Sequence, residues 1–334
     1  MKIAILAVRD TGAVGYCLAH AINKVTPEHH AINLRAQRSY INYPSIVDMG
    51  DYTIAECRKM VYNADVIVFV SAIKPIIDGL HLTKRKLKGT KKIIYESGSI
   101  WRFNRKQFIE QADKHLGTYE IALSEPGLFM PYREDDPDVD ASFLPPIRSF
   151  SEIQEQFGMC NQDHAAIEQF AVPKKRVVFA HAPTSEEKKG STTFFRAITQ
   201  AMQLLPNVTF LTIRQQPWVT CLRMIASADV LLDQDPPFQP VSYGGITIEA
   251  SIFKLPVITK IDPRCIAWYQ HELGMSTPFI TWNSEEELLE RVYRLATNEK
   301  LRHVFGDACY TFCKALHDEQ AGVERFFKIV EAMD

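Results

Sequence analysis

The sequence lacks an apolar run long enough to cross a membrane, which takes about 18 to 20 consecutive residues. The opening MKIAILAV is apolar but ends at Arg9-Asp10, so we predict neither a transmembrane helix nor a signal peptide. Cysteine is sparse, because the 334 residues contain only 7, at scattered positions without the spacing of a zinc site. These features predict a cytoplasmic protein with reduced thiols and no metal centre.

Several nucleotide-binding and catalytic motifs are also missing. The segment KKGSTT places Lys189 before Gly190, whereas a P-loop needs the order G-x-x-x-x-G-K-[ST]. Gly12 and Gly15 do not complete a G-x-G-x-x-G motif, which disfavours a nicotinamide enzyme, and without a G-x-S-x-G motif a hydrolase is disfavoured too. A formal net charge of -2 argues against general binding to polyanions but leaves room for a local basic patch.

Repeated short apolar runs, each followed by a helical pattern, predict a doubly wound α/β architecture. A chain of 334 residues is also longer than one hydrophobic core usually covers, which favours two domains. The pair Pro145-Pro146 fits neither a central strand nor a helix, so it predicts a semi-rigid crossing between the domains. The predicted strands lie at residues 3–8, 66–70, 92–95, 119–123, 174–182, 208–213, 230–232 and 257–259.

The domain boundaries follow from this pattern. We predict one Rossmann-like domain over residues 1–148 and a second over residues 149–317, with a last helix at about 318–334. Ser284 and Glu287 predict a capping box ahead of a buried helical stripe. Two such domains would form a cleft between the carboxyl ends of their sheets, where ligands of parallel sheets bind.

The stretch SYGGITIEASIFKLPVI, residues 242–258, predicts a phosphate site. Gly244 and Gly245 precede an amphipathic helix, so a ligand can approach the backbone, and the N–H groups of Ile246 and Thr247 would face it at the positive end of the helix dipole. Glu249, one turn later, is placed to accept hydrogen bonds from a ribose diol. An equally weighted alternative is that Glu249 only complements the helix dipole.

Several motifs in the second half resemble the nucleotide-binding domain of family-4 glycosyltransferases, which have the GT-B fold of two facing Rossmann-like domains. A subset of that family carries a DQ…WYG…EA…GKPV pattern and a HAP…KG[ST] pattern. The matching residues here are Asp233-Gln234, Tyr243-Gly244, Glu249-Ala250, FKLPVI, His181-Ala182-Pro183 and Lys189-Gly190-Ser191. The segment ALHDEQAGVERFFKIVE is similar to the family's last helix, which crosses back to the first domain.

The resemblance implies roles for individual residues of a donor site. Glu249 would bind the donor ribose and Lys189 the diphosphate, where a lysine suits the negative charge that the leaving group gains. The amides of Ile246 and Thr247 would contact the phosphate or the sugar-proximal oxygens. The full predicted donor site is Gly12, His181, Lys189, Asp233, Tyr243, Gly244, Gly245, Ile246, Thr247 and Glu249, with Lys189 and Glu249 as the catalytic pair. A second glutamate that often contacts the transferred sugar is replaced by Val241.

The acceptor side would lie in the first domain. YESGSIWR, residues 95–102, resembles the family's HGSxxR segment, with Ser97 at the usual histidine position, and Ser99 and Arg102 match. Glu96 is a candidate polar contact there, although an exposed strand-end carboxylate is the commoner arrangement. The basic stretch between Lys84 and Lys92 would contact an anionic acceptor or surface, or else form a solvated face.

These features together predict a GT-B glycosyltransferase of the retaining type, with a nucleotide diphosphate sugar as donor substrate and no required cofactor or metal. The acceptor would be a glycan, a lipid-linked glycan or a hydroxymethylated DNA base, the last of which would have to be flipped out of its stack. The sugar would be a hexose or a pentose. Two alternatives stay open: a sugar-nucleotide epimerase, and a non-catalytic partner protein that binds nucleotide sugars.

Overall fold

The computed structural model describes residues 1–10, 12–37, 47–96, 99–130, 140–158, 176–238 and 240–333. For residues 99, 100, 102 and 103 it describes the backbone alone. The chain divides into two compact units: unit 1 consists of Met1–Arg148 and Leu316–Asp334, and unit 2 of Ser149–Ala315. In the described ranges, no helix has both the length and the apolar character of a membrane span.

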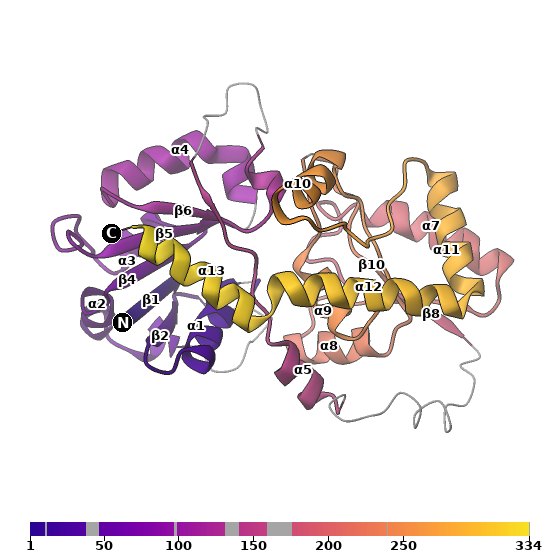
Figure 1. The fold of residues 1–334 in the computed structure, drawn as a ribbon, viewed down its shortest axis with the longest axis horizontal. Helices are drawn as coiled ribbons and strands as arrows, with labels where there is room; N and C mark the ends of the chain where they lie inside the picture. The colour runs from indigo at the N-terminus through magenta and orange to yellow at the C-terminus, as the bar shows by residue number, and fades with distance from the viewer. Residues whose placement is uncertain are drawn as a thin grey trace. The chain divides into compact units, whose positions relative to one another are not determined.

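Unit 1 is built on a parallel sheet of seven strands in the order β3-β2-β1-β4-β5-β6-β7 (Figure 1). Four of these strands coincide with predicted apolar runs, whereas β2, β3 and β7 were not predicted from the sequence. The strands are β1 (Lys2–Ala7), β2 (His30–Arg35), β3 (Val47–Asp48), β4 (Val66–Val70), β5 (Lys91–Glu96), β6 (Glu120–Leu123) and β7 (Ser142–Phe143).

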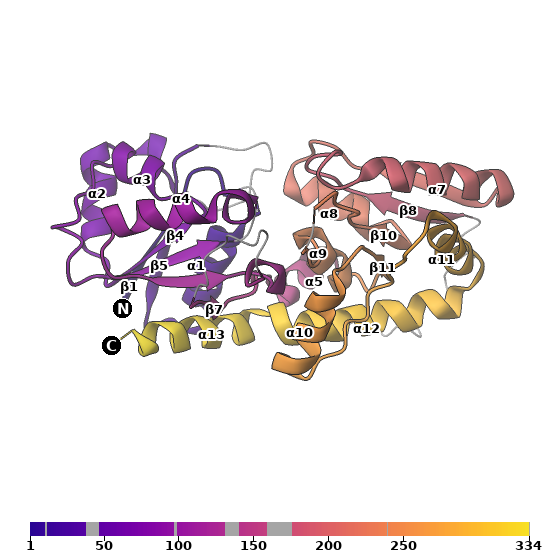
Figure 2. The ribbon, with the colours of Figure 1, turned by 90° about the horizontal axis from the view of Figure 1, so that it is seen from above.

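Side chains alternate between the two faces of this sheet, and each face has its own helices. Ile3 and Ile5 of β1 pack with α1 (Val14–Val25) and α13 (Glu319–Ala332), which lie side by side (Figure 1). The other face packs against the helices drawn opposite α13 in Figure 2. These are α2 (Ile54–Tyr62), α3 (Lys74–Gly79) and α4 (Ser99–His115); the short turns η1 (Met49–Asp51) and η2 (Pro126–Leu128) complete the unit.

Unit 2 holds a smaller parallel sheet in the order β11-β10-β8-β9, made of β8 (Val177–His181), β9 (Val208–Thr212), β10 (Val230–Leu232) and β11 (Val257–Ile258). Its apolar core lies between this sheet and two helices, α7 and α11, and α8 packs against α9. The helices are α5 (Phe150–Gln156), α7 (Ser191–Leu204), α8 (Trp218–Ala226), α9 (Gly245–Ile252), α10 (Pro263–Leu273), α11 (Glu285–Thr297) and α12 (Glu299–His317).

The start of α11 departs in part from the predicted capping box. The Ser284 hydroxyl accepts a hydrogen bond from the Glu287 N–H at 3.2 Å, as predicted. The Glu287 carboxylate, however, accepts from the N–H of Asn283 at 2.9 Å, one residue earlier than the box requires. Behind this start, Leu288, Val292 and Leu295 are buried, as the apolar spacing predicted.

Candidate functional site

Lys189 is held in a turn that is joined closely to the segment after β10. Gly190 has a φ of 61°, and a Cβ there would lie 1.8 Å from the Asp235 carbonyl oxygen, so glycine is required twice over. The Asp235 N–H donates to the Lys189 carbonyl at 2.9 Å. The Lys189 Nζ donates to Gln234 Oε1 at 2.5 Å and lies 3.3 Å from Asp233 Oδ1. The ammonium group is thus fixed beside the end of β10.

Asp233 caps α9 from inside the protein. Its side chain is fully buried and accepts hydrogen bonds from the Gly244 N–H at 2.6 Å and from the Thr247 hydroxyl at 2.8 Å. Asp233 was predicted to contact the donor, and in the structure its carboxylate oxygens are occupied by these internal partners. The Thr247 N–H, which was predicted to face a phosphate, donates to the Gly244 carbonyl at 3.0 Å. The amides of Gly245 and Ile246 remain in the first turn, where no intrahelical acceptor reaches them.

Gly244 allows Lys189 to approach the start of α9. A Cβ at this position would lie 2.5 Å from Lys189 Nζ and 2.6 Å from Asp233 Oδ1. Its φ of -83° is accessible to any residue, so the need for glycine here is steric and not conformational. The predicted lysine and the predicted helix start therefore lie together, with Asp233 between them.

Glu249 lies on the second turn of α9 and is 5% exposed. Its Oε1 accepts a hydrogen bond of 3.1 Å from the Nε1 of Trp218, the first residue of α8. Trp218 was not predicted from the sequence, where the only signal was an aromatic residue directly after Pro217 at a helix start. The indole therefore orients the carboxylate that was predicted to bind ribose.

His181, which was predicted to contact the donor, is completely buried at the end of β8. Its Nδ1 lies 2.8 Å from the Leu232 carbonyl and its Nε2 2.7 Å from the Ser191 hydroxyl. A carbonyl only accepts, so Nδ1 carries the proton and Ser191 donates to Nε2. Burial lowers the pKa of His181, which favours this neutral form. His181 thus ties β10 to the start of α7, next to Lys189.

The Tyr243 ring packs within an aromatic cluster of unit 2. Its centroid lies 4.7 Å from that of Phe279, 5.9 Å from Tyr269 and 6.1 Å from Phe312. Burial raises the pKa of Tyr243. The cluster anchors the backbone that leads into Gly244, so this ring positions the start of α9.

The glycine turn of unit 1 resembles the α9 start in one respect. Asp10, which follows β1, is buried and accepts hydrogen bonds from the N–H groups of Gly15 at 2.9 Å and Tyr16 at 2.8 Å. Burial raises the pKa of Asp10, although these two bonds oppose the rise. Gly12 is exposed, and its carbonyl accepts from Arg148 Nη2 at 3.0 Å. The helix end beside Gly12 is therefore already occupied by a carboxylate.

Glu96, at the end of β5, is not the exposed strand-end carboxylate that is common at such positions. It is 0% exposed, and neither carboxylate oxygen has a hydrogen-bond partner of good geometry among the described residues. Burial raises its pKa to about 8, and the nearby Ser71 hydroxyl offsets only part of the rise. Ser99 and Arg102 lie in α4, where only their backbone is described, and Ser97 falls outside the described residues.

The basic stretch from Lys84 to Lys92 is largely used in internal contacts. Lys92 is buried and donates to the Leu87 carbonyl at 3.0 Å, and burial lowers its pKa. Lys84 and Lys91 donate to backbone carbonyls as well, both at 2.8 Å. The stretch precedes β5 and so lies at the amino ends of the strands, away from the carboxyl ends where ligands of such sheets bind. The basic stretch is therefore not placed to contact an acceptor bound at the carboxyl edge of the sheet.

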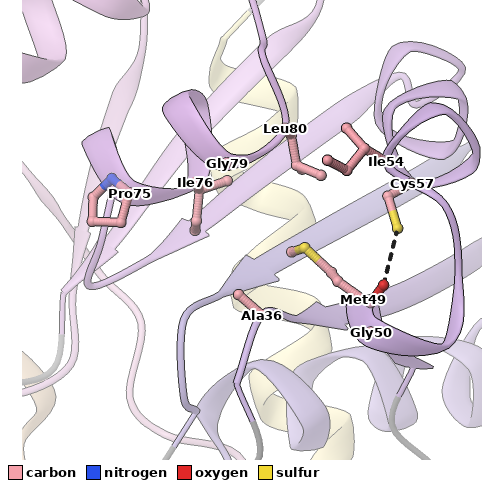
Figure 3. A pocket seen from close by; sticks show the side chains of 9 residues that line it. All are labelled: Ala36, Met49, Gly50, Ile54, Cys57, Pro75, Ile76, Gly79 and Leu80. Atoms are coloured by element: carbon pink, nitrogen blue, oxygen red, sulfur yellow. Dashed lines mark hydrogen bonds between the residues drawn. The ribbon is translucent and has the colours of Figure 1, made fainter.

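Unit 1 also contains an apolar pocket of about 240 Å³ (Figure 3). Met49, Ile54, Ile76 and Leu80 point into it, and the Cys57 thiol lies 3.9 Å from the Met49 carbonyl oxygen. None of the predicted site residues lines this pocket.

Comparison with solved structures identifies the architecture. An alpha-glucosyltransferase in complex with UDP and a 13-mer DNA matches with a TM-score of 0.65 at 11% identity, over 99% of both chains. HepE from Anabaena, in complex with UDP and glucose, matches with a TM-score of 0.63 at 11% identity, over 99% of this chain and 100% of that one. The chain has the GT-B fold.

The GT-B match extends to enzymes of another reaction class. A UDP-GlcNAc 2-epimerase from Neisseria meningitidis, bound to UDP-GlcNAc, matches with a TM-score of 0.53 at 10% identity, over 99% of this chain and 100% of that one. No protein-family model matches the sequence, and no curated protein matches it either. In this GT-B chain, the predicted residues Lys189 and Gly244 lie together at the start of α9, and Glu249 follows on the second turn of that helix.

Proposed function

We propose that the chain is a glycosyltransferase that transfers a sugar from a nucleotide diphosphate donor to an acceptor hydroxyl. The observation that carries the proposal is the arrangement around α9. A lysine ammonium lies against the start of the helix, and a buried, oriented carboxylate lies one turn further along it. The cation suits a diphosphate and the carboxylate suits a ribose diol, and both groups are needed to bind a nucleotide of this kind.

Lys189 and Glu249 have different roles in this reaction. As the bond between the sugar C1 and the diphosphate oxygen breaks, Lys189 and the amides of Gly245 and Ile246 stabilise the charge that builds up on the leaving group. The acceptor oxygen bonds to C1, and its proton goes to the departing phosphate, which gives retention of configuration without a protein base. Glu249 holds the nucleoside while this happens. His181, Asp233 and Tyr243 act by positioning these groups.

The choice of donor to test is guided by the ligands in solved structures of similar fold. Solved structures of similar fold contain UDP or a UDP-sugar, which makes a uridine donor the first to test. The acceptor would be held by unit 1, and we propose a glycan, a lipid-linked glycan or a hydroxymethylated DNA base, with a hexose or pentose transferred. No disulfide joins the six described cysteines, which supports a cytoplasmic location.

The epimerase alternative has a specific observation in its favour, because the Neisseria meningitidis epimerase matches over almost the whole chain. A non-catalytic partner protein is the other alternative, since Val241, at the position of the family's second glutamate, is an apolar residue that is 3% exposed. Consumption of UDP-sugar separates the three functions. Transfer requires an acceptor, epimerisation does not, and a binding partner leaves the donor unchanged.

Calorimetric titration with UDP, GDP and ADP tests the donor site directly. We expect one nucleotide to bind, and Glu249→Ala to weaken that binding by about 1.5 to 3 kcal/mol, the range for losing a hydrogen bond to a charged group. The matched control is Glu272→Ala, on an exposed carboxylate of α10. No binding of any of the three nucleotides to the wild-type protein would refute the proposal. Equal affinity of the folded Glu249→Ala variant would refute the ribose assignment alone.

A further inference from the structure

The transferred sugar of the proposed donor has a defined place relative to α9. In a nucleotide sugar the diphosphate joins the ribose to the transferred sugar, so the three parts follow one another in line. With the ribose at Glu249 on the second turn of α9 and the diphosphate beside Lys189 at the helix start, the sugar extends beyond that start. It therefore lies towards residues 241–243, the segment that leads into Gly244.

The side chains of this segment offer the sugar little to bind. Val241 is apolar and 3% exposed. Ser242 is completely buried, with its hydroxyl 3.1 Å from that of Tyr269. The Tyr243 ring belongs to the aromatic cluster of unit 2. Polar groups for the sugar therefore have to come from a neighbouring segment.

The loop from β11 to α10 is such a neighbour. β10 and β11 pair in parallel register, so the residues that follow them lie at the same edge of the sheet. Two backbone hydrogen bonds tie this loop to the donor site. The Lys260 N–H donates to the Gln234 carbonyl at 2.8 Å, and the Asp262 N–H donates to the Val241 carbonyl at 3.0 Å. The start of α10 is thus fixed beside the segment that precedes α9.

Arg264, in the first turn of α10, is an exposed cation held in one orientation. Asp262 is the buried N-cap of this helix, and its Oδ1 accepts from the Arg264 N–H at 2.8 Å and from Nε at 3.0 Å. Its Oδ2 accepts from Nη2 at 2.8 Å. The arginine side chain is nevertheless 58% exposed. A guanidinium has five N–H bonds, of which the carboxylate uses two, and the described part of the chain gives the other three no acceptor.

The charge at this position favours an anionic ligand. Asp262 balances the charge of Arg264, but it also faces the start of α10, where the helix dipole contributes roughly half a positive charge. The carboxylate, the guanidinium and the helix start together therefore carry a net positive charge. A guanidinium held in place pairs best with a carboxylate, because its planar fork matches the two carboxylate oxygens. A neutral sugar hydroxyl offers no such match.

We propose that Arg264 selects a donor sugar that carries a carboxylate, namely a hexuronic acid. The proposal rests on the proposed function, since it assumes a nucleotide sugar at Lys189 and Glu249. In a hexuronic acid the carboxylate is C6, attached to the ring at C5, and C1 is the atom whose bond to the diphosphate breaks. Arg264 holds the sugar by the carboxylate and does not touch the reacting bond. It is therefore a residue that determines specificity and takes no part in the chemical step.

Two pairs of donors test the proposal, because the members of each pair differ only at C6. Calorimetric titration of the full chain compares UDP-glucuronic acid with UDP-glucose, and UDP-galacturonic acid with UDP-galactose. We expect the acid of at least one pair to bind about 10- to 150-fold more tightly than its neutral partner, the range for a hydrogen bond to a charged group. If the protein selects another nucleotide, the hexuronic acid and hexose conjugates of that nucleotide make the same comparison.

Arg264→Gln shows whether the guanidinium is responsible for the preference. We expect this variant to bind the acid and its neutral partner with equal affinity, and to bind UDP, which has no transferred sugar, as tightly as the wild type does. Arg294→Gln is the matched control, on an exposed arginine of α11 that lies 3.8 Å from Glu290, and it should retain the preference. Circular dichroism checks that both variants are folded.

The outcomes distinguish this inference from the function on which it rests. If the wild-type protein binds none of UDP, GDP and ADP, the proposed function fails and the inference fails with it. If it binds a nucleotide but prefers the acid in neither pair, or if Arg264→Gln keeps the preference, the function stands and the assignment of Arg264 is overturned. Equal weakening of UDP and of both sugar conjugates in Arg264→Gln would mean that the guanidinium contacts the diphosphate, which also overturns it.

Discussion

Glu96→Gln is expected to stabilise the protein increasingly as the pH rises. The Glu96 carboxyl is 0% exposed, and in the part of the chain that the structure describes neither of its oxygens has a hydrogen-bond partner of good geometry. An ionised carboxylate in that position loses its hydration with only partial compensation from the Ser71 hydroxyl, which is why its pKa rises to about 8. Glutamine keeps the shape of the side chain and cannot ionise.

The sign and size of the effect follow from proton linkage. Below the ordinary pKa of 4.5, Glu96 is protonated in both the folded and the unfolded chain and contributes no difference. Between 4.5 and about 8 the unfolded chain releases the proton while the folded chain retains it, so the free energy of unfolding falls as the pH rises, and it levels off above 8. Each pH unit in this range lowers the free energy of unfolding by at most about 1.4 kcal/mol, so the whole decrease between pH 4.5 and about 8 is at most about 5 kcal/mol.

Urea unfolding of the full-length protein at pH 5, 6.5 and 8 measures this effect. We expect the free energy of unfolding of Glu96→Gln to exceed that of the wild type by an amount that grows across the three pH values. Glu110→Gln, on an exposed position of α4, is the control and should show a difference that does not change with pH. A constant difference for Glu96→Gln, or a variant less stable than the wild type at pH 8, would show that the carboxyl is ionised and partnered.

Three further predictions concern stability. Asp233→Asn removes the negative charge opposite Lys189 and leaves only one side-chain oxygen to serve both the α9 cap and that lysine, and it should lower the free energy of unfolding by about 3 kcal/mol in urea titrations. Asp235→Asn, which leaves the cap intact, should be nearly neutral. Gly190→Ala places a Cβ on a residue with a φ of 61° and against the Asp235 carbonyl. It should lower the free energy of unfolding by roughly 2 to 4 kcal/mol, which a lower Tm would report. Burial lowers the pKa of His317 to about 3, so between pH 6.5 and 3 only the unfolded chain takes up a proton. The free energy of unfolding should therefore fall as the pH drops through this range. In acid titrations, His317→Gln should lose this dependence of the free energy of unfolding on pH.

Strands and helices with uninterrupted apolar patterns could be predicted from the sequence, and β4 and the stripe of α11 are examples. β2 could not, because its alternation is broken by Asn33 and Arg35, which are nonetheless 4% and 3% exposed. Arg35 is buried because its Nη2 meets Asp48 at 2.7 Å, a partner on a neighbouring strand that no local pattern reveals. Apolar periodicity therefore locates strands whose burial is hydrophobic and misses those whose burial depends on ion pairs.

In the candidate site, the sequence identified which residues gather but not the role of each one. The motifs selected Lys189, Asp233 and His181 together, but they did not distinguish the ammonium group that a ligand can reach from the buried groups that hold it. Asp233 accepts from Gly244, eleven residues later at the start of α9, and His181 reaches Ser191, ten residues further along the chain. Such contacts depend on where strands end in the folded sheet, which spacing along the chain does not specify.

Both units use a buried aspartate after a strand to cap the next helix, but the described cations beside the two aspartates differ in exposure. Asp10 is flanked by Arg35 and Arg148, whose charges act on its pKa, and these arginines are 3% and 2% exposed. The side chain of Lys189, beside Asp233, is 19% exposed. The ammonium group beside the α9 cap is therefore more accessible to an anion than the two arginines beside the α1 cap. The nucleotide phosphates are expected at unit 2 for this reason, and Lys189 would bind them while still bonded to Asp233.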